Sequence, residues 1–435
     1  MDSISFISFL PLILTLVLFF LKVPIGISLI SASLFYFCFI NTSSPPHLAL
    51  QNMISGLESF PLLAIPFFML AGVVMNYSGI SSRLMDFADL LVGHMPGSLG
   101  QVNVLLSTLM GGISGSSNAD AAMQCKMLVP EMVRRGYSKE FSTAVTACSS
   151  LIPSIIPPGM MLIIYSMVAG TSIGKMFMAG YIPGLLLCVT MMIVVHIEAR
   201  KSGYGATRER RATLIELAGG IKAALLALFM PFGLVLGMRF GAFTATEGGA
   251  ICVFYCLIVG VFIYKEIKPK HLIPIFRETF YATADVMFII IGASLFGYYL
   301  TWERIPHMVS QMLLGITENK YLFLLLINVF LLILGMFVDS GPAIIILVPL
   351  LMEPLQAMGI DLVHFGLIMV LNLQAGGLTP PFGSMMFITC SMTKVPITKY
   401  VKACVPFYLA IIVTLLLCTY LPGMVMLLPN LMYPV

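Results

Sequence analysis

Long apolar runs recur from one end of the chain to the other and are separated by short polar stretches. Runs of this kind predict membrane-spanning helices, because crossing the hydrocarbon core takes about 20 apolar residues. The strands of a membrane barrel are excluded, since they would show about 10 residues of alternating polarity. The predicted spans are 5–21, 24–40, 62–76, 176–197, 221–238, 247–264, 281–300 and 404–427.

The composition agrees with a chain whose main solvent is lipid. Of the 435 residues, 59% are hydrophobic and 10% are charged, whereas a soluble domain carries about 25% charged residues. We therefore predict an all-α polytopic membrane protein without a soluble domain. No basic, aromatic-rich surface indicates nucleic acid, and no CxxC pair indicates a metal or redox site.

Basic residues predict the orientation of the spans. The densest basic loop covers 198–222, and a second basic loop covers 265–270. Cytoplasmic loops carry an excess of lysine and arginine, and the two spans between these loops return the chain to the same side. Both loops are therefore predicted to be cytoplasmic, and Lys22 between the first two spans suggests an N-terminus outside.

A polar run interrupts the apolar pattern twice. Residues 111–130 read GGISGSSNADAAMQCKMLVP, and residues 335–349 read GMFVDSGPAIIILVP. In each copy an aspartate precedes a proline by ten positions, and a later glycine precedes a Pro-Pro pair by 21 positions. The shared order of landmarks predicts an internal duplication, with two inverted repeats. The landmarks are Asp120, Pro130, Gly136 and Pro157-Pro158, then Asp339, Pro349, Gly359 and Pro380-Pro381.

Each repeat also contains a proline-rich interruption at membrane depth. Segments 141–174 and 362–393 carry no Asp, Glu, Lys or Arg, yet each holds a Pro-Pro pair, and proline breaks a helix because it lacks the backbone donor. Irregular backbone inside lipid survives only where it is buried or lines a cavity. The preceding segments, 98–135 and 321–358, are predicted to be re-entrant hairpins of two short helices. Discontinuous helices at matching positions of two repeats point to a transport site.

These interruptions suit two kinds of ligand. Free backbone carbonyls and hydroxyls suit a hard cation, which prefers oxygen ligands. Helix N-termini at the hairpin tips suit an anion. Together they predict sodium-coupled uptake of a carboxylate.

Six motifs occur in order: PLLAIPFFMLAGVVMNYSGIS (61–81), GISGSSNADAA (112–122), PSIIPPG (153–159), TATEGGA (244–250), DSGPAIIILVP (339–349) and GLTPPFG (377–383). With these motifs the chain resembles the large membrane subunit of a TRAP (tripartite ATP-independent periplasmic) transporter. The resemblance implies an elevator-type ion-transporter fold, in which a transport domain slides against a fixed scaffold. It implies two or more Na⁺ as coupling ions and no organic cofactor. It also implies a location in the bacterial inner membrane. The implied partners are a small four-helix membrane subunit, a periplasmic substrate-binding protein, and an organic acid such as a C4-dicarboxylate or sialic acid.

The resemblance also divides the chain and assigns candidate residues. The implied segments are N-terminal scaffold helices at 1–97, transport-domain repeat 1 at 98–174, scaffold helices with cytoplasmic connections at 175–320, transport-domain repeat 2 at 321–392 and a C-terminal helix at 393–435. The implied site residues are Ser114, Ser116, Pro153, Ile156 and Pro158 for one sodium ion, Gly335, Gly376, Thr379 and Phe382 for a second, and Asn118 and Gly341 for the substrate.

The acidic residues near these motifs leave alternatives open. A proton-coupled carrier of the same fold would use Asp120 or Asp339 as its acid, although we favour a helix-capping role for both. Asp285 faces either a domain interface or an aqueous edge. Glu247 is predicted to have a structural role at the start of a span.

Two other classes of protein fit the sequence less well. Residues 112–115 spell GxSG, which resembles the nucleophile motif of rhomboid intramembrane proteases. Such a serine needs a histidine base, and no histidine here lies in that family's paired motif, so an enzyme is not predicted.

A channel would use rings of carbonyls or charges, usually through oligomeric symmetry, whereas two broken units within one chain favour an alternating carrier.

Overall fold

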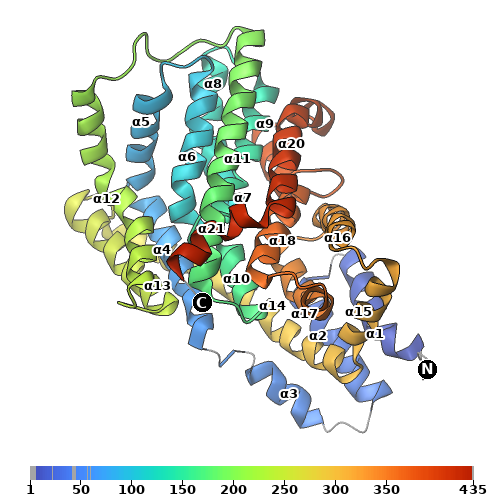
Figure 1. The fold of residues 1–435 in the computed structure, drawn as a ribbon. Coiled ribbons are helices and arrows are strands. Elements are labelled where there is room, and N and C mark those ends of the chain that lie inside the picture. Colours follow the sequence, from blue (N-terminus) through green and yellow to red (C-terminus); the bar gives the residue numbers. More distant parts are fainter. Residues whose placement is uncertain (1–5, 22, 42–45, 56, 59, 434–435) are drawn as a thin grey trace.

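The structure is a computed structural model that describes residues 6–21, 23–41, 46–55, 57–58 and 60–433. Throughout these residues the backbone forms helices joined by turns, and no strand occurs (Figure 1). The prediction of an all-α protein is therefore confirmed. Within the same part of the chain, 5 helices are long and apolar enough to cross a membrane, or up to 8 if each bent helix pair is one span.

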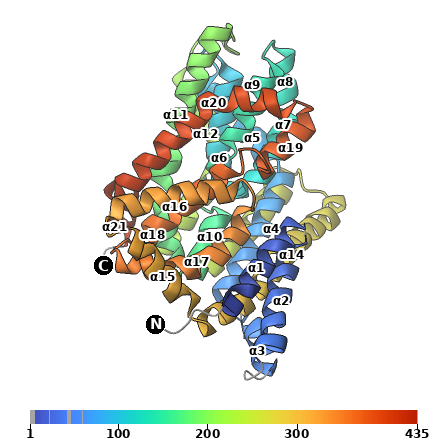
Figure 2. The same ribbon diagram turned by 90° about the vertical axis from the view of Figure 1, so that its right-hand side faces the viewer.

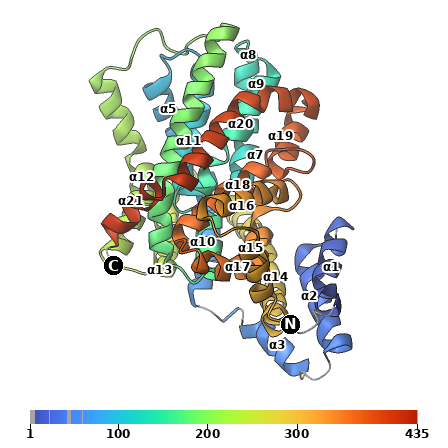
Figure 3. The ribbon, with the colours of Figure 1, turned by 45° about the vertical axis from the view of Figure 1, so that its right-hand side comes forward.

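The first three helices lie together at one side of the molecule (Figure 3). They pack against the C-terminal half of a long helix, α14, in an apolar cluster that is separate from the main core. Within this cluster the ring centroids of Tyr36 and Tyr299 are 4.9 Å apart. The helices are α1 (Phe6–Phe20), α2 (Ile25–Phe35), α3 (Pro46–Ser55) and α14 (Pro269–Trp302).

Two amphipathic helices precede the predicted hairpins, and the apolar pattern does not predict either as a span. Helix α5 (Ile80–Val92) follows α4 (Ala64–Tyr77) after a bend of 70°. Gly79 forms this bend with a φ of 74°, a conformation that glycine adopts without steric cost. Helix α15 (Ile305–Ile316) is bent by 118° from the helix that follows it. Polar residues recur along both helices, at Asp86 and Asp89 in α5 and at His307 and Gln311 in α15, so neither has the continuous apolar run of a span.

Segment 98–174 forms two helices that meet at a tight turn and then an interrupted helix. The interruption coincides with the prolines, which lack the N–H that a continuous helix requires. A short 3-10 turn at Ile152–Ser154 and a cis Pro157-Pro158 bond fill the gap. The helices are α6 (Ser98–Ser114), α7 (Ser117–Met127), α8 (Val129–Arg134), α9 (Lys139–Ser149) and α10 (Met160–Val168).

Long helices connect the two predicted repeats. They are α11 (Ile173–Ser202), α12 (Leu214–Arg239), α13 (Ala245–Ile258) and α14. Helix α13 begins with a capping box, in which the Thr244 hydroxyl accepts the Glu247 N–H at 3.3 Å and the Glu247 carboxylate accepts the Thr244 N–H at 2.7 Å. The predicted structural role of Glu247 is confirmed, because it satisfies a donor at the helix start.

Segment 321–392 follows the same order of elements as segment 98–174. Two helices meet at a turn before Asp339, and the next helix is interrupted around the cis Pro380-Pro381 bond. The helices are α16 (Lys320–Gly335), α17 (Ser340–Ala357), α18 (Leu362–Gly376) and α19 (Ser384–Thr393), followed by α20 (Ile397–Tyr420) and α21 (Pro422–Met432). Every residue of α18 after Leu362 is buried, which places this helix at the centre of the main core.

The two segments exchange contacts in a reciprocal way. Helix α7 of the first segment packs against α19 of the second, and α17 of the second packs against α10 of the first (Figure 2). Each hairpin therefore lies beside the half-helix that follows the other segment's break. This exchange brings both hairpin turns and both proline breaks into one region of the molecule.

Large apolar side chains cover much of the outer surface. Phe254, Phe262 and Phe280 expose 67%, 71% and 69% of their surface. Such exposure would be unfavourable in water but suits contact with lipid chains. The exposed apolar residues thus agree with the prediction of a membrane protein.

Candidate functional site

The first hairpin turn touches the first proline break through backbone atoms. The Gly115 carbonyl accepts the N–H of Met160, the first residue of α10, at 3.1 Å. A Cβ added to Gly115 would lie 2.6 Å from the Pro158 carbonyl oxygen. Gly115 also has a φ of 56°. Only glycine therefore allows this close approach of turn and break.

Of the predicted residues of the first sodium site, Pro158 lies at this contact, and Pro153 and Ile156 lie against Gly111, four residues before Gly115. Pro153, Ile156 and Pro158 are all buried, and Ser116 begins α7, where its Oγ accepts the Ala119 N–H at 3.4 Å. Ser114 ends α6, but its side chain lies outside the described residues. The structure thus gives Ser116 a capping contact, and sodium binding by these residues stays a prediction.

Backbone oxygens at the first break remain without donors. Among the described residues, the carbonyl oxygens of Ile156 and Pro158 receive no hydrogen bond. Buried carbonyls normally have a partner, and a hard cation is a suitable one because it prefers oxygen ligands. The residues present at the first break therefore fit a sodium ion.

The second hairpin turn touches the second break in the same manner. The Met336 carbonyl accepts the Phe382 N–H at 3.1 Å. A Cβ on Gly376 would lie 2.6 Å from the Gly335 Cα atom, so two glycines let α16 and α18 approach closely. The Thr379 Oγ1 donates to the Gly376 carbonyl at 2.8 Å, which is the capping contact that a hydroxyl beside a freed carbonyl is expected to make. Four predicted residues of the second sodium site thus lie together, and ion binding there also stays a prediction.

Asn118 lies at a polar contact between the two segments. The Ser384 Oγ, at the start of α19, is 3.4 Å from the Asn118 Oδ1 and 3.5 Å from the Asp339 Oδ1. Ser384 was not predicted, although it directly follows the GLTPPFG motif. An amide, a hydroxyl and a carboxylate therefore meet where α7, α17 and α19 begin, which can hold a polar ligand.

Gly341 lines a cavity of 360 Å³ beside this contact. The cavity also touches Asp339, Met161 of α10 and Asp285 of α14. A Cβ on Gly341 would meet only distant side-chain atoms, the nearest being Met161 Cε at 3.9 Å. The structure therefore places Gly341 on a cavity wall, two residues after Asp339.

The capping role predicted for Asp120 is wrong. Ser116 is the N-cap of α7, and the buried Asp120 carboxylate accepts the Ser107 hydroxyl at 2.9 Å and the Gln124 amide at 2.7 Å. The Ser107 Oγ also lies 3.1 Å from the Ser149 Oγ of α9. Asp120 lies inside the first turn, so its side chain reaches α6 instead of the helix end. A buried polar network therefore joins α6, α7 and α9.

The prediction that the Asp339 side chain caps α17 is also wrong. Asp339 does occupy the N-cap position of α17, but its carboxylate makes no capping hydrogen bond there. The carboxylate instead approaches Ser384 and the cavity. Its acceptor oxygens are therefore available to a ligand.

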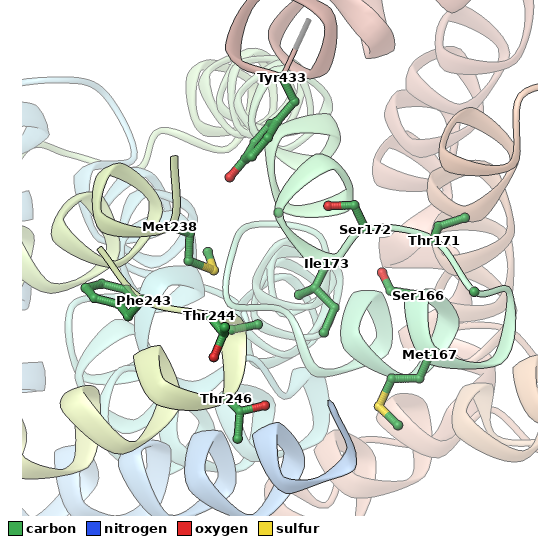
Figure 4. Close-up of a pocket in the computed structure, with 13 residues that line it drawn as sticks. Ser166, Met167, Thr171, Ser172, Ile173, Met238, Phe243, Thr244, Thr246 and Tyr433 are labelled. Atoms are coloured by element: carbon green, nitrogen blue, oxygen red, sulfur yellow. The ribbon is translucent and has the colours of Figure 1, made fainter. Parts of the chain in front are cut away.

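A larger cavity, of 510 Å³, lies elsewhere (Figure 4). The loop from Gly170 to Gly174, the residues around Thr244 and the Tyr433 ring line it. None of the predicted site residues is part of its wall, so cavity size alone does not locate the site.

Comparisons with known proteins show which proteins this chain is similar to. A family model described as "Tripartite ATP-independent periplasmic transporter, DctM component" matches residues 12–424. The sialic acid TRAP transporter large permease protein SiaM of Vibrio cholerae is 37% identical over 414 residues, 95% of this chain and 96% of that protein. The C4-dicarboxylate TRAP transporter large permease protein DctM of Pseudomonas aeruginosa is 35% identical over 373 residues, 86% of this chain and 87% of that protein. The YdaH transporter of Alcanivorax borkumensis shares the fold, with a TM-score of 0.66 and 14% identity over 95% of this chain and 98% of that chain.

Proposed function

This chain belongs to the DctM family of tripartite ATP-independent periplasmic transporters, and on that premise we propose that it imports an organic acid by sodium symport. The chain is a multi-pass protein of the inner membrane and a transporter permease, not an enzyme. In the proposed transporter it acts with a small membrane subunit and with a periplasmic protein that delivers the substrate. Sialic acid and a C4-dicarboxylate are the candidate substrates, since two similar permeases are named for them.

Unpartnered backbone oxygens carry the proposal of sodium coupling. The Ile156 and Pro158 carbonyls lack donors among the described residues, and the Gly115 turn lies against the Pro158 carbonyl. A sodium ion bound there would hold the hairpin turn against the break. The substrate anion would lie between the turns, near Asn118 and Gly341, where the N-terminus of α17 favours negative charge.

The packing of the helices supports an elevator movement. Because α7 packs on α19 and α17 packs on α10, the two hairpins and the two broken helices can move as one unit. Helices α1, α2 and α3 form an apolar cluster mainly with α14, which suits a fixed scaffold. The cluster also includes Leu350 of α17, so the scaffold contacts the second hairpin there. The amphipathic α5 and α15, each bent from its neighbour, would connect the moving and fixed parts.

A proton-coupled carrier of the same fold is the second candidate. The buried Asp120 favours it, because an acid at membrane depth is a common proton carrier. Its carboxylate, however, is held by Ser107 and Gln124 inside the first hairpin. This network gives Asp120 a structural role that requires no proton transfer.

Uptake into proteoliposomes tests the coupling ion. The complete transporter, with its small subunit and a binding protein, is supplied with radiolabelled organic acid at constant pH and with either sodium or choline outside. We expect uptake only with sodium, and a steeper dependence on sodium than on a preset proton gradient. Uptake that continues unchanged in choline would refute sodium coupling and favour the proton-coupled carrier.

A further inference from the structure

The cavity beside Gly341 lies between two parts of the molecule. The start of α17 and Met161 of α10 form one wall, and Asp285 and Phe288 of α14 form the opposite wall. Its volume of 360 Å³ falls in the range of about 300–1,000 Å³ that small-molecule sites occupy. A substrate held between the hairpin turns would therefore face α14 across this space.

Asp285 is an unusual residue for its position. It lies near the middle of α14, which is apolar and long enough to cross a membrane, and its side chain is exposed to the cavity. Ionisable residues inside membrane spans are costly and usually mark a substrate or ion pathway. Among the described residues no ion pair involves Asp285. Its carboxylate is therefore available to whatever enters the cavity.

The charges that line the cavity are all negative. Asp285 and Asp339 are its only ionisable lining residues, and the wall includes no Lys, Arg or His. An ionised carboxylate can only accept hydrogen bonds. It binds hydroxyl groups through short, charge-assisted bonds, but it offers nothing to a second carboxylate of a substrate.

We infer that Asp285 determines the substrate class, and that the cavity selects an acid with one carboxylate and several hydroxyl groups. Resting on the proposed function, this inference places the single carboxylate of the substrate at the N-terminus of α17, whose free N–H groups favour an anion. The hydroxyl groups donate to Asp285 and Asp339. Because one helix N-terminus serves one anionic group, a dicarboxylate would bring its second charge toward Asp285 and Asp339 without a cationic partner. Unpaired charge of this kind is an effective means of rejecting a wrong ligand.

Ligand-dependent thermal unfolding of the purified membrane complex in sodium tests this selection without a binding protein. The probes are two hydroxylated monocarboxylates, N-acetylneuraminate and gluconate, and two dicarboxylates, succinate and fumarate. We expect at least one hydroxylated acid, and neither dicarboxylate, to raise the unfolding temperature of the wild-type protein. Asp285→Asn keeps the size of the side chain and removes its charge, so it should weaken the effective acid about tenfold and allow a response to succinate.

Asp86→Asn is the matched control, because Asp86 is an exposed acid on α5 that does not line the cavity. It should leave all four responses unchanged. A wild-type response to a dicarboxylate, no response to either hydroxylated acid, or equal responses in wild type and Asp285→Asn would each overturn the inference. The proposed function fails separately, when proteoliposomes show no sodium-dependent uptake of any organic acid. Sodium-dependent uptake of succinate would leave that function intact and contradict the selection alone.

Discussion

Replacing Gly115 by alanine tests whether the contact between the first turn and the first break holds the sodium site. The substitution brings two costs. A left-handed φ costs an L-residue roughly 1–2 kcal/mol, and here φ is 56°. The new Cβ would lie 2.6 Å from the Pro158 oxygen, and relieving such overpacking costs roughly 1–3 kcal/mol. Together the costs are roughly 2–5 kcal/mol, which is a large part of a protein's net stability.

Gly136→Ala is the control that separates the two costs. Gly136 has a φ of 87°, but a Cβ there would meet nothing within 4 Å. This variant therefore carries the backbone cost alone. Gly115→Ala can relieve the overlap of its Cβ by moving the turn away from Pro158. The overlap cost of roughly 1–3 kcal/mol then falls on the ion site and weakens sodium binding by about 5- to 150-fold.

The half-saturating sodium concentration for uptake, measured in proteoliposomes, reports this loss. Thermal unfolding of both purified variants reports how much of the cost falls on folding. We expect Gly115→Ala to need far more sodium than the wild type, whereas Gly136→Ala keeps the wild-type requirement. Equal sodium requirements in the two variants would show that the turn and the break do not build the ion site together.

Three further substitutions test the polar contacts around the site. Ser107→Ala removes a donor from the buried Asp120 carboxylate and should lower the free energy of unfolding by about 1–3 kcal/mol. Thr108→Ala removes a bond within α6 and a contact with the uncharged Cys188 thiol, so it should cost less. Equal unfolding temperatures of the two variants would contradict this expectation. Thr379→Ala should raise the sodium concentration needed for uptake before it lowers protein abundance. Thr379→Ser keeps the hydroxyl and should leave the sodium requirement unchanged. A wild-type sodium dependence in the alanine variant would remove Thr379 from the site. Thr244→Ala breaks the capping box of α13 and should lower the free energy of unfolding by about 1 kcal/mol. The sodium dependence of uptake should not change. A changed sodium dependence would instead give the TATEGGA motif a functional role.

Local patterns were sufficient for most helices and for both breaks. The long apolar runs predicted α11, α13 and α20, because a continuous apolar segment has few other stable environments. The proline pairs predicted where helices stop, because a missing N–H acts on the residues next to it. The apolar pattern did not predict α5 and α15, because an amphipathic helix has no continuous apolar run.

Contacts between distant segments were harder to predict. Asp120 follows a run of small polar residues and therefore suggested a helix cap, but packing of α6 and α9 directs its carboxylate into a buried network. Ser384 looks like an ordinary small residue in the sequence. Its meeting with Asn118 and Asp339 arises only because α19 packs against α7.

The sequence by itself determined that this protein is a bundle of membrane helices with two proline-broken segments, because hydrophobicity and the missing donor of proline act locally along the chain. Its six motifs also indicated the family. The tertiary structure alone decided which backbone oxygens stay unpaired, that Gly115 lies on Pro158, and that Asp285 faces the hairpin tip across a cavity. These are distances between residues far apart in the chain, and only the packing of whole helices fixes them.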